Sequence, residues 1–351
     1  MKILFVDGTK GFSPTRLSEK PTGGILTSLT LIPRYLAKCG HDVYVYSVHD
    51  KDETVEGVNY VKNPLVLVPD VVVFNRNSID RPSVLHFKKL NPAVRIVWWL
   101  HDIVQMTYLN DDGAYLADSI VALSEYCRNT YADFYGIASH RFSIIPNGVD
   151  RDVFYTNEEP RDSSLFIHCS APVKGTYPLP VTTYNLRRHD PRVEVRSYAS
   201  QRLHDMDDND SIKREMEMLK QAGVRFMDPI PQKELADTFR KAWALLMPNH
   251  YPEICSNILL QARACGLPIV ASNIGSVSEF IEHRETGMLT HSFPHDMFLW
   301  HKDFAEQVVT LQKDHALHAH ISKQSPIGIP SWDAIGARWN KLLTKDLVEV
   351  S

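Results

Sequence analysis

Short apolar runs recur along the chain, and longer stretches with helical spacing separate them. Nearly every position within a run is apolar, as in strands that a parallel sheet buries on both faces. The helical stretches then supply the crossover connections, so the pattern predicts a doubly wound α/β architecture. The predicted strands are Ile3–Val6, Val43–Ser47, Val71–Phe74, Ile96–Leu100, Ser119–Leu123, Ser143–Ile145, Leu165–Cys169, Val193–Tyr198, Val224–Phe226, Ala244–Met247 and Ile269–Ala271.

A polar segment between Asn147 and Ser163 interrupts this alternation. We therefore expect two Rossmann-like domains, residues 1–157 and 158–330, joined by a hinge. The last segment, residues 331–351, has apolar residues at helical spacing and is expected to cross back to the first domain. Open parallel sheets bind ligands beyond the carboxyl ends of their strands, so the predicted site is a cleft where the two sheets face each other.

Composition fits an ordinary globular protein of this size. The 351 residues are 44% hydrophobic and 23% charged, which is enough apolar material for two cores. The net charge of −4 argues against a nucleic-acid partner, because nucleic-acid binders usually carry a concentrated basic face. Five scattered cysteines without a CxxC pair indicate neither a disulfide framework nor a zinc site. We expect a protein of the reducing cytoplasm.

Neither a leader nor a membrane span is predicted. The chain starts with MKILFVDG, which reads as a buried strand and lacks the three regions of a signal peptide. The most apolar stretch, Leu65–Phe74, is interrupted by Pro69 and Asp70 and is far shorter than the roughly 20 residues that span a bilayer. Contact with the inner face of the membrane stays open.

The most informative stretch, Met247–Ile281, reads as a strand, a loop with one carboxylate, a helix, a turn and another strand. Ser256 or Asn257 is suited to cap the helix, and the amides of its first turn would be free to bind an anion such as a diphosphate. Glu253, just before the helix, could accept hydrogen bonds from sugar hydroxyls. A capped helix after a strand is also common in purely structural settings, and spacing alone leaves both interpretations open.

Polar residues follow other strands as well. His101 and Asp102 end the run IVWWL, and Lys174 with Gly175 follows the first strand of the second domain. The pair Gly23 and Gly24 precedes a predicted helix, where glycines allow the backbone to approach a ligand. Taken by themselves, Lys174–Gly175 and Gly23–Gly24 are more typical of ordinary turns. Polar residues at the end of such an apolar run are not typical of a core, and the alternative for His101 is a histidine that only supports its neighbours.

Together these segments resemble the retaining GT-B glycosyltransferases of the family-4 type (glycosyl transferases group 1). The stretch from Glu253 matches the donor-site signature of that family, which is a glutamate, seven residues, a second glutamate, and then alanine, a small residue, glycine and proline. Four further motifs and a closing segment occur in the family's order. They are PTGGI at 21–25, HD at 101–102, PNGVD at 146–150, VKG at 173–175 and SWDAIGARWNKLL at 331–343.

The resemblance implies a role for each matching residue, with two departures. Gln261 stands where the family has its second glutamate, on the ribose, and residues 169–171 lack the arginine that usually joins the lysine at the diphosphate. The implied catalytic residues are His101, Asp102 and Glu253. The implied donor-binding residues are Gly23, Gly24, Lys174, Gly175, Ile230, Ile254, Cys255, Ser256, Asn257, Gln261 and Glu279.

By this resemblance the chain transfers a sugar from a UDP-, GDP- or ADP-sugar to a glycan, lipid-linked or other hydroxyl acceptor, as in polysaccharide biosynthesis. The resemblance also implies retention of configuration and no metal or other cofactor. Basic residues between Thr9 and Thr22 agree with an anionic or lipid-linked acceptor. Two alternatives remain: a GT-B epimerase or hydrolase, and a non-catalytic sugar-nucleotide-binding subunit. We interpret His315, His318 and His320 as part of a solvated helix rather than as metal ligands.

Overall fold

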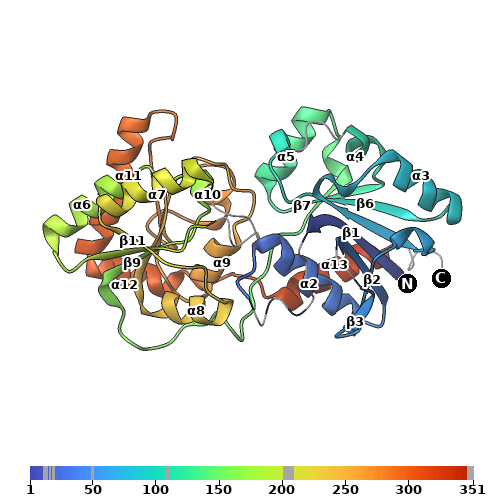
Figure 1. Ribbon diagram of the computed structural model, residues 1–351, viewed down its shortest axis with the longest axis horizontal. Coiled ribbons are helices and arrows are strands. Elements are labelled where there is room, and N and C mark those ends of the chain that lie inside the picture. The colour runs from blue at the N-terminus through green and yellow to red at the C-terminus, as the bar shows by residue number, and fades with distance from the viewer. Residues whose placement is uncertain are drawn as a thin grey trace. The chain divides into compact units, whose positions relative to one another are not determined.

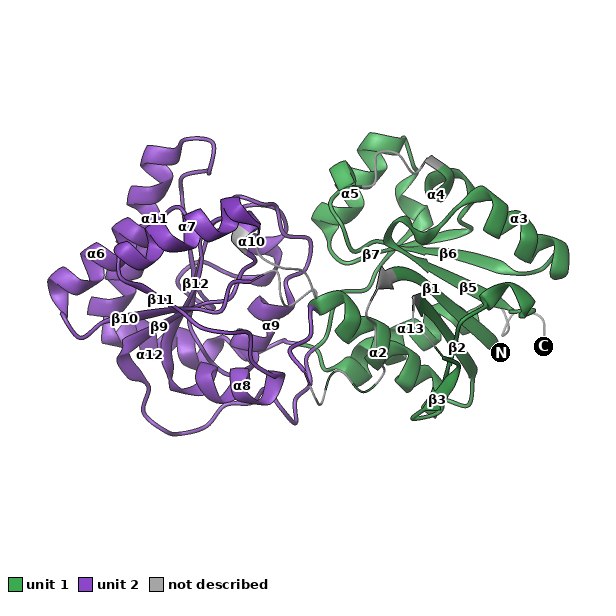
Figure 2. Cartoon of the chain, in the orientation of Figure 1, with its two compact units in different colours: residues 1–17, 24–148, 330–351 green, residues 18–23, 149–329 purple. Residues whose placement is uncertain are grey.

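The computed structural model describes residues 1–10, 15, 17, 20–48, 51–106, 111–200 and 209–345. It divides into two compact units (Figure 2): unit 1 is residues 1–17, 24–148 and 330–351, and unit 2 is residues 18–23 and 149–329. The division follows Gly148 and not residue 157. Phe154 packs against Phe239, with ring centroids 6.4 Å apart, and Arg240 donates to the Val153 carbonyl, so the start of the polar segment belongs to unit 2.

Unit 1 contains, within its described residues, an eight-stranded sheet in the order β3-β4-β2-β1-β5-β6-β7-β8. All neighbouring strands are parallel except β3 and β4, which form an antiparallel hairpin. The strands are β1 (Lys2–Lys10), β2 (Asp42–Val48), β3 (Glu53–Val55), β4 (Val58–Val61), β5 (Val71–Asn75), β6 (Arg95–Trp99), β7 (Ser119–Ala122) and β8 (Phe142–Ile144).

Helices cover both faces of this sheet (Figure 1). Adjacent strand residues point to opposite faces. Trp98 accordingly packs against Tyr131 of α5, with ring centroids 5.5 Å apart, whereas Trp99 packs against Trp339 of α13 at 4.9 Å. The helices are α2 (Gly24–Lys38), α3 (Arg81–Leu90), α4 (Asp111–Leu116), α5 (Glu125–Tyr135) and α13 (Trp332–Thr344), with short 3₁₀ turns η1 (Pro64–Val66), η2 (Arg76–Ser78), η3 (Val104–Met106) and η4 (Ser139–Arg141).

Unit 2 is built on a six-stranded parallel sheet, as far as its residues are described, in the order β11-β10-β9-β12-β13-β14. Its chain starts in the middle of the sheet at β9 and moves first to one edge and then to the other, which is the doubly wound topology. The strands are β9 (Asp162–His168), β10 (Glu194–Ser197), β11 (Val224–Phe226), β12 (Ala242–Met247), β13 (Ile269–Ala271) and β14 (Met288–Leu289).

One face of this sheet packs against α6, α7, α11 and α12 around a core that includes Leu186, Leu219, Phe304 and Ile321. Helices α8 and α9 pack against β12 and β13. No helix in the described parts of either unit combines the length and the apolar character needed to cross a bilayer. The helices of unit 2 are α6 (Leu179–His189), α7 (Asp210–Gln221), α8 (Gln232–Lys241), α9 (Asn257–Ala264), α10 (Val277–Phe280), α11 (Met297–Lys313) and α12 (His315–Gln324), with the 3₁₀ turn η5 (Pro172–Lys174).

The predicted fold class is confirmed, and each predicted strand overlaps an observed one. The sequence pattern missed β3, β4 and β14. The first two form a short hairpin with polar residues such as Glu53 and Asn59, whose turn has positive φ at Glu56 and Gly57. Strand β14 has two residues, which is too short for any periodicity to be visible.

The interpretation of α12 as a solvated helix is wrong for one residue. His318 is buried, stacks on Trp243 with ring centroids 3.4 Å apart, and contacts the Trp243 carbonyl oxygen through Nε2 at 2.9 Å. Burial lowers its pKa to about 4. His168 at the end of β9 is also fully buried, with Nδ1 2.9 Å from Ser197 Oγ, and burial likewise lowers its pKa to about 4. Both side chains are therefore neutral at pH 7.

The burial of His168 makes unit 2 sensitive to acid. The native state resists a proton that the unfolded chain binds near pH 6.5, so stability is full above that pH and falls as the pH drops toward 4. Between pH 6.5 and 5.5 one such histidine costs about 1 kcal/mol. We expect His168→Gln to reduce the pH dependence of urea unfolding by this amount, while His295→Gln, at an exposed position, leaves it unchanged. Equal pH dependence in wild type and His168→Gln would contradict this account.

Candidate functional site

Three neighbouring strands of unit 2 carry the central part of the predicted site. Lys174 lies in the loop after β9, Glu253 in the loop after β12, and Gly275 in the loop after β13. Because β9, β12 and β13 are adjacent and parallel, their carboxyl ends share one edge of the sheet and the three loops meet there. The fold thus brings together residues that are far apart in the sequence.

The centre of this edge is an ion pair. The ammonium of Lys174 lies 2.8 Å from Glu253 Oε1, and the side-chain amide of Asn249 donates to the same oxygen at 2.8 Å. The Glu253 side chain is only 8% exposed, whereas that of Lys174 is 32% exposed and lies over the Tyr251 ring, 5.1 Å from its centroid. A buried carboxylate requires such partners, because removing a charge from water is costly. The more exposed Lys174 is the partner that a ligand can reach.

The backbone of Lys174 is fixed by the loop that follows β12. Its carbonyl accepts hydrogen bonds from the amides of His250, at 2.7 Å, and Tyr251, at 3.3 Å. At the next residue, Gly175, φ is +125°, and a Cβ there would lie 2.6 Å from His250 Nδ1 and 2.7 Å from the Pro248 carbonyl oxygen. Only glycine fits this position, so the VKG motif serves to bring two loops into contact.

The backbone of Glu253 is fixed from the other side. It forms a bridge with Gly275, and its carbonyl accepts a hydrogen bond from the Ser276 amide at 2.7 Å. The φ of Gly275 is +67°, and a Cβ there would lie 2.3 Å from the Glu253 carbonyl oxygen and 2.6 Å from its nitrogen. The carboxylate therefore projects from a backbone with little freedom to move.

Helix α9 begins directly after this loop. Its N-cap residue, Ser256, has extended backbone torsions and makes no side-chain hydrogen bond to the helix, and the first turn contains no acidic residue. The Ser256 side chain thus leaves the amides of Ile258 and Leu259, which an N-cap usually binds, available, and the helix dipole adds partial positive charge there. Ile254 and Cys255, which precede the helix, are buried. This arrangement suits an anion.

Two polar residues of this edge escaped the sequence analysis. Asn249 Oδ1 and Ser276 Oγ are buried and have no hydrogen-bond partner among the described residues. Asn249 already contacts Glu253 through its amide nitrogen, and the Ser276 amide contacts the Glu253 carbonyl. Polar residues shortly after the apolar runs of β12 and β13 were the available signal. Buried acceptors and hydroxyls of this kind can bind ligand hydroxyls.

The other predicted residues of unit 2 lie on the same elements or beside them. Gln261 is buried on α9, four residues after Asn257 and so on the same helix face. Ile230 is half-buried in the loop between β11 and α8, and Glu279 is exposed on α10. Residues 169–171, which lack the family's arginine, follow β9 at this edge.

His101 and Asp102 belong to unit 1, at the end of β6. Asp102 forms an ion pair with Arg76 at 2.6 Å, a residue that the sequence analysis did not identify. The His101 ring lies 4.3 Å from the Trp99 ring, and its buried Nε2 has no hydrogen-bond partner among the described residues. Burial, assisted by the charge of Arg76, lowers the pKa of His101 to about 3, so the ring is neutral. Of the glycine pair, Gly24 begins α2 of unit 1, whereas Gly23 is grouped with unit 2.

No three His, Cys, Asp or Glu side chains in the described ranges are grouped so as to hold a metal ion. Half of the basic segment Thr9–Thr22, Arg16 included, falls outside the described residues.

Comparison with known proteins supplies the family. The model for Glycosyltransferase Family 4 matches residues 22–153, and the model for Glycosyl transferases group 1 matches residues 194–314. The chain is 31% identical over 127 residues to D-inositol 3-phosphate glycosyltransferase from Thermobispora bispora. That match covers 36% of this chain and 28% of the relative's length.

Solved structures show the same fold over the whole chain. Sucrose-phosphate synthase from Thermosynechococcus elongatus has a TM-score of 0.79 at 16% identity, with all of both chains covered. Anabaena HepE, solved in complex with UDP and glucose, has a TM-score of 0.71 at 18% identity, covering 98% of this chain and all of the other. With one family match in each unit and this fold, the chain belongs to the group 1, family-4 glycosyltransferases of the GT-B fold.

Proposed function

We propose that unit 2 binds a nucleotide-diphosphate sugar and that the enzyme transfers its sugar to a hydroxyl acceptor with retention of configuration. The observation that carries this proposal is the ion pair between Lys174 and Glu253, beside the start of α9, where Ser256 provides no side-chain cap. A lysine and a set of helix amides at one edge of a sheet form a site for two phosphate groups. Glu253 and Asn249 offer oxygen atoms for the hydroxyls of the attached sugar.

The chemistry follows from where charge develops. The bond between the anomeric carbon and the phosphate oxygen breaks, a bond to the acceptor oxygen forms, and negative charge remains on the nucleoside diphosphate. The Lys174 ammonium leaves Glu253 and pairs with this diphosphate. Its positive charge then stabilises the departing group without a metal. Glu253 then accepts hydrogen bonds from the sugar. The acceptor's proton passes to the leaving phosphate, which requires no separate general base.

For His101 we propose contact with the donor sugar. A ring that is neutral at pH 7 and has a buried Nε2 without a partner can exchange a hydrogen bond with an uncharged hydroxyl. Asp102 fixes the turn that contains His101. Its carboxylate pairs with Arg76, and its backbone carbonyl accepts a hydrogen bond from the Tyr131 hydroxyl at 3.0 Å.

A thermal-shift screen against UDP-, GDP- and ADP-sugars tests donor binding, because a ligand that binds only the native state raises the melting temperature. UDP-sugars come first, since Anabaena HepE was solved with UDP and glucose. We expect stabilisation by at least one family of donors and none by the free sugar. A glycan or lipid-linked acceptor and a cytoplasmic location at or near the membrane complete the proposal.

Product analysis separates the proposed transfer from the alternatives. An α-linked product from an α-linked donor, formed equally well in EDTA, would support retention without a metal, whereas an inverted product would exclude it. Gln261 and the missing arginine near residue 170 favour a weakly active or non-catalytic subunit as the second candidate. Donor binding without turnover in the presence of any acceptor would support that candidate.

Gln261 provides a direct test of ribose contact. An amide makes neutral hydrogen bonds, and charge-assisted ones are roughly twice as strong. If Gln261 lies on the ribose, Gln261→Glu should tighten donor binding by about fivefold, measured by calorimetry, while binding of the free sugar does not change. Gln221→Glu, at an exposed position on α7, controls for the added negative charge. Unchanged donor affinity in Gln261→Glu would remove this residue from the site.

A further inference from the structure

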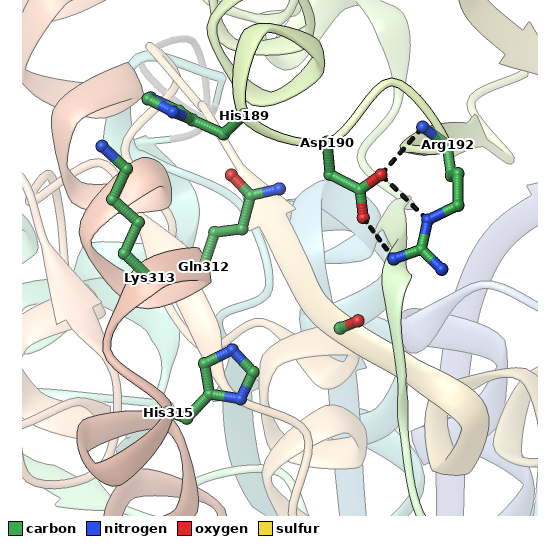
Figure 3. A pocket seen from close by; sticks show the side chains of 7 residues that line it. His189, Asp190, Arg192, Gln312, Lys313 and His315 are labelled. Atoms are coloured by element: carbon green, nitrogen blue, oxygen red, sulfur yellow. Dashed lines mark hydrogen bonds and ion pairs between the residues drawn. The ribbon is translucent and has the colours of Figure 1, made fainter.

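A polar pocket lies in unit 2, away from the edge that contains Lys174. It has a volume of about 310 Å³ and is lined by Ser163, His189, Asp190, Arg192, Gln312, Lys313 and His315. Ser163 is at the start of β9, and 190–192 precede β10, so the pocket lies at the amino ends of strands whose carboxyl ends border the proposed donor site. Figure 3 shows side chains of α6, α11 and α12 and of the turn after α6 around this pocket.

The charge of the pocket is positive once its ion pair is taken into account. Asp190 accepts three hydrogen bonds from Arg192, from the backbone amide and from the guanidinium, at 2.8–3.0 Å. These bonds to Arg192 lower the pKa of Asp190, so its charge is neutralised by the arginine. Lys313 has no ion-pair partner in the described part of the chain. An unpaired ammonium in a polar pocket is suited to an anion.

Gln312 supplies a second and independent observation. Its side chain is buried, and its Oε1 atom has no hydrogen-bond partner among the described residues, although Gln312 lines the pocket. Figure 3 shows its amide group between His189 and Asp190. A buried carbonyl oxygen left without a donor costs about 1–3 kcal/mol, so a ligand that offers a hydroxyl would be favoured there. A sugar offers several such hydroxyls.

The lining also excludes other ligand classes. All seven lining residues are polar or charged, so the pocket offers many hydrogen-bonding groups and no aliphatic side chain. The lone carboxylate, that of Asp190, is already paired with Arg192, and no three His, Cys, Asp or Glu side chains of the described residues are grouped here to hold a metal ion. The volume is at the lower end of ligand pockets, which run from about 300 to 1,000 Å³, and suits one small ring.

From these observations we propose that the pocket between α6 and the junction of α11 and α12 binds an anionic monosaccharide unit, with its carboxylate or phosphate on Lys313 and a hydroxyl on Gln312 Oε1. Such a unit can be part of a charged glycan or a free sugar phosphate. The site is separate from the proposed donor site, so it can be occupied while a nucleotide is bound.

Calorimetry on the full chain tests the proposal with four probes: glucuronate, glucose 6-phosphate, glucose and inorganic phosphate. We expect saturable binding of glucuronate or glucose 6-phosphate, and binding of glucose and phosphate that is weaker by about tenfold, the equivalent of one lost charge-assisted hydrogen bond. Preference for glucuronate indicates a glycan unit, and preference for glucose 6-phosphate indicates a free sugar phosphate. No saturable binding of either probe, or equal affinity for glucose, would overturn the proposal.

Variants locate the binding. Lys313→Gln should lower the affinity for the preferred probe by about tenfold. Lys302→Gln, at an exposed position on the same helix, should leave this affinity unchanged. Gln312→Met keeps the length of the side chain but removes the acceptor oxygen, and it should lower the affinity for the probe by a similar factor. Because Lys313 is at the surface, Lys313→Gln remains informative even if Gln312→Met does not fold. Unchanged affinity in Lys313→Gln, or displacement of the probe by UDP, GDP or ADP, would contradict a separate site.

Discussion

Replacing Lys174 by methionine is expected to lower the rate of sugar transfer by about 100-fold to 1,000-fold, the usual loss when one group that stabilises developing negative charge is removed. In our account the ammonium binds the diphosphate most strongly as the sugar departs, so kcat should fall more than substrate affinity. The measurement is steady-state kinetics with the donor found in the thermal-shift screen. A loss of less than about fivefold would show that Lys174 does not act on the leaving group.

Controls separate this effect from damage to the fold. Lys174→Met leaves the Glu253 carboxylate buried with the uncharged Asn249 amide as a partner, so some stability will be lost. The double variant Lys174→Met/Glu253→Gln removes both charges and should regain part of that stability without regaining activity. Lys241→Met, at an exposed position in unit 2, should match wild type in both assays.

Replacing Gly275 by alanine is expected to destabilise unit 2 by about 3 kcal/mol and to abolish donor binding, because the added Cβ collides with backbone that cannot move away cheaply. The new atom would lie 2.3 Å from the Glu253 carbonyl oxygen, and the backbone at φ +67° is unfavourable for alanine in any case. Urea unfolding gives the stability change, and the thermal-shift screen gives donor binding.

Gly328 provides the matched control for Gly275. It is also in unit 2 and has φ +76°, but a Cβ added there would meet nothing within 4 Å. Gly328→Ala should therefore cost only about 1 kcal/mol, the strain of the left-handed conformation, and donor binding should persist. If the two variants lose equal stability, close packing against Glu253 is not what requires glycine at 275.

The fold was predictable because one pattern, an apolar run followed by a stretch with helical spacing, recurs along the chain. Apolar runs such as Val71–Phe74 are buried on both faces of a sheet and show no alternation, which distinguishes them from surface strands. The hairpin of β3 and β4 and the short β14 were not predictable, since their few residues are partly polar and pairing with neighbours decides their conformation. The burial of His318 depends on Trp243, which is 75 residues away, and no local pattern encodes that contact.

The candidate site was predictable only in part. The positions of Lys174 and Glu253 at the ends of strands followed from the alternation of elements, and the resemblance to the family pointed to their chemistry. Their direct ion pair, and the participation of Asn249 and Ser276, required the structure, because these contacts join loops after three different strands. The role of Arg76 also required the structure, because its ion pair with Asp102 joins the segments that follow β5 and β6 of unit 1.

Calorimetry with nucleoside diphosphates and the matching monophosphates tests most directly the claim that Lys174 and the start of α9 bind a diphosphate. We predict that wild type binds one of UDP, GDP or ADP at least about tenfold more tightly than its monophosphate, and that Lys174→Met removes most of this difference. An equal preference for the diphosphate in Lys174→Met and wild type would contradict it.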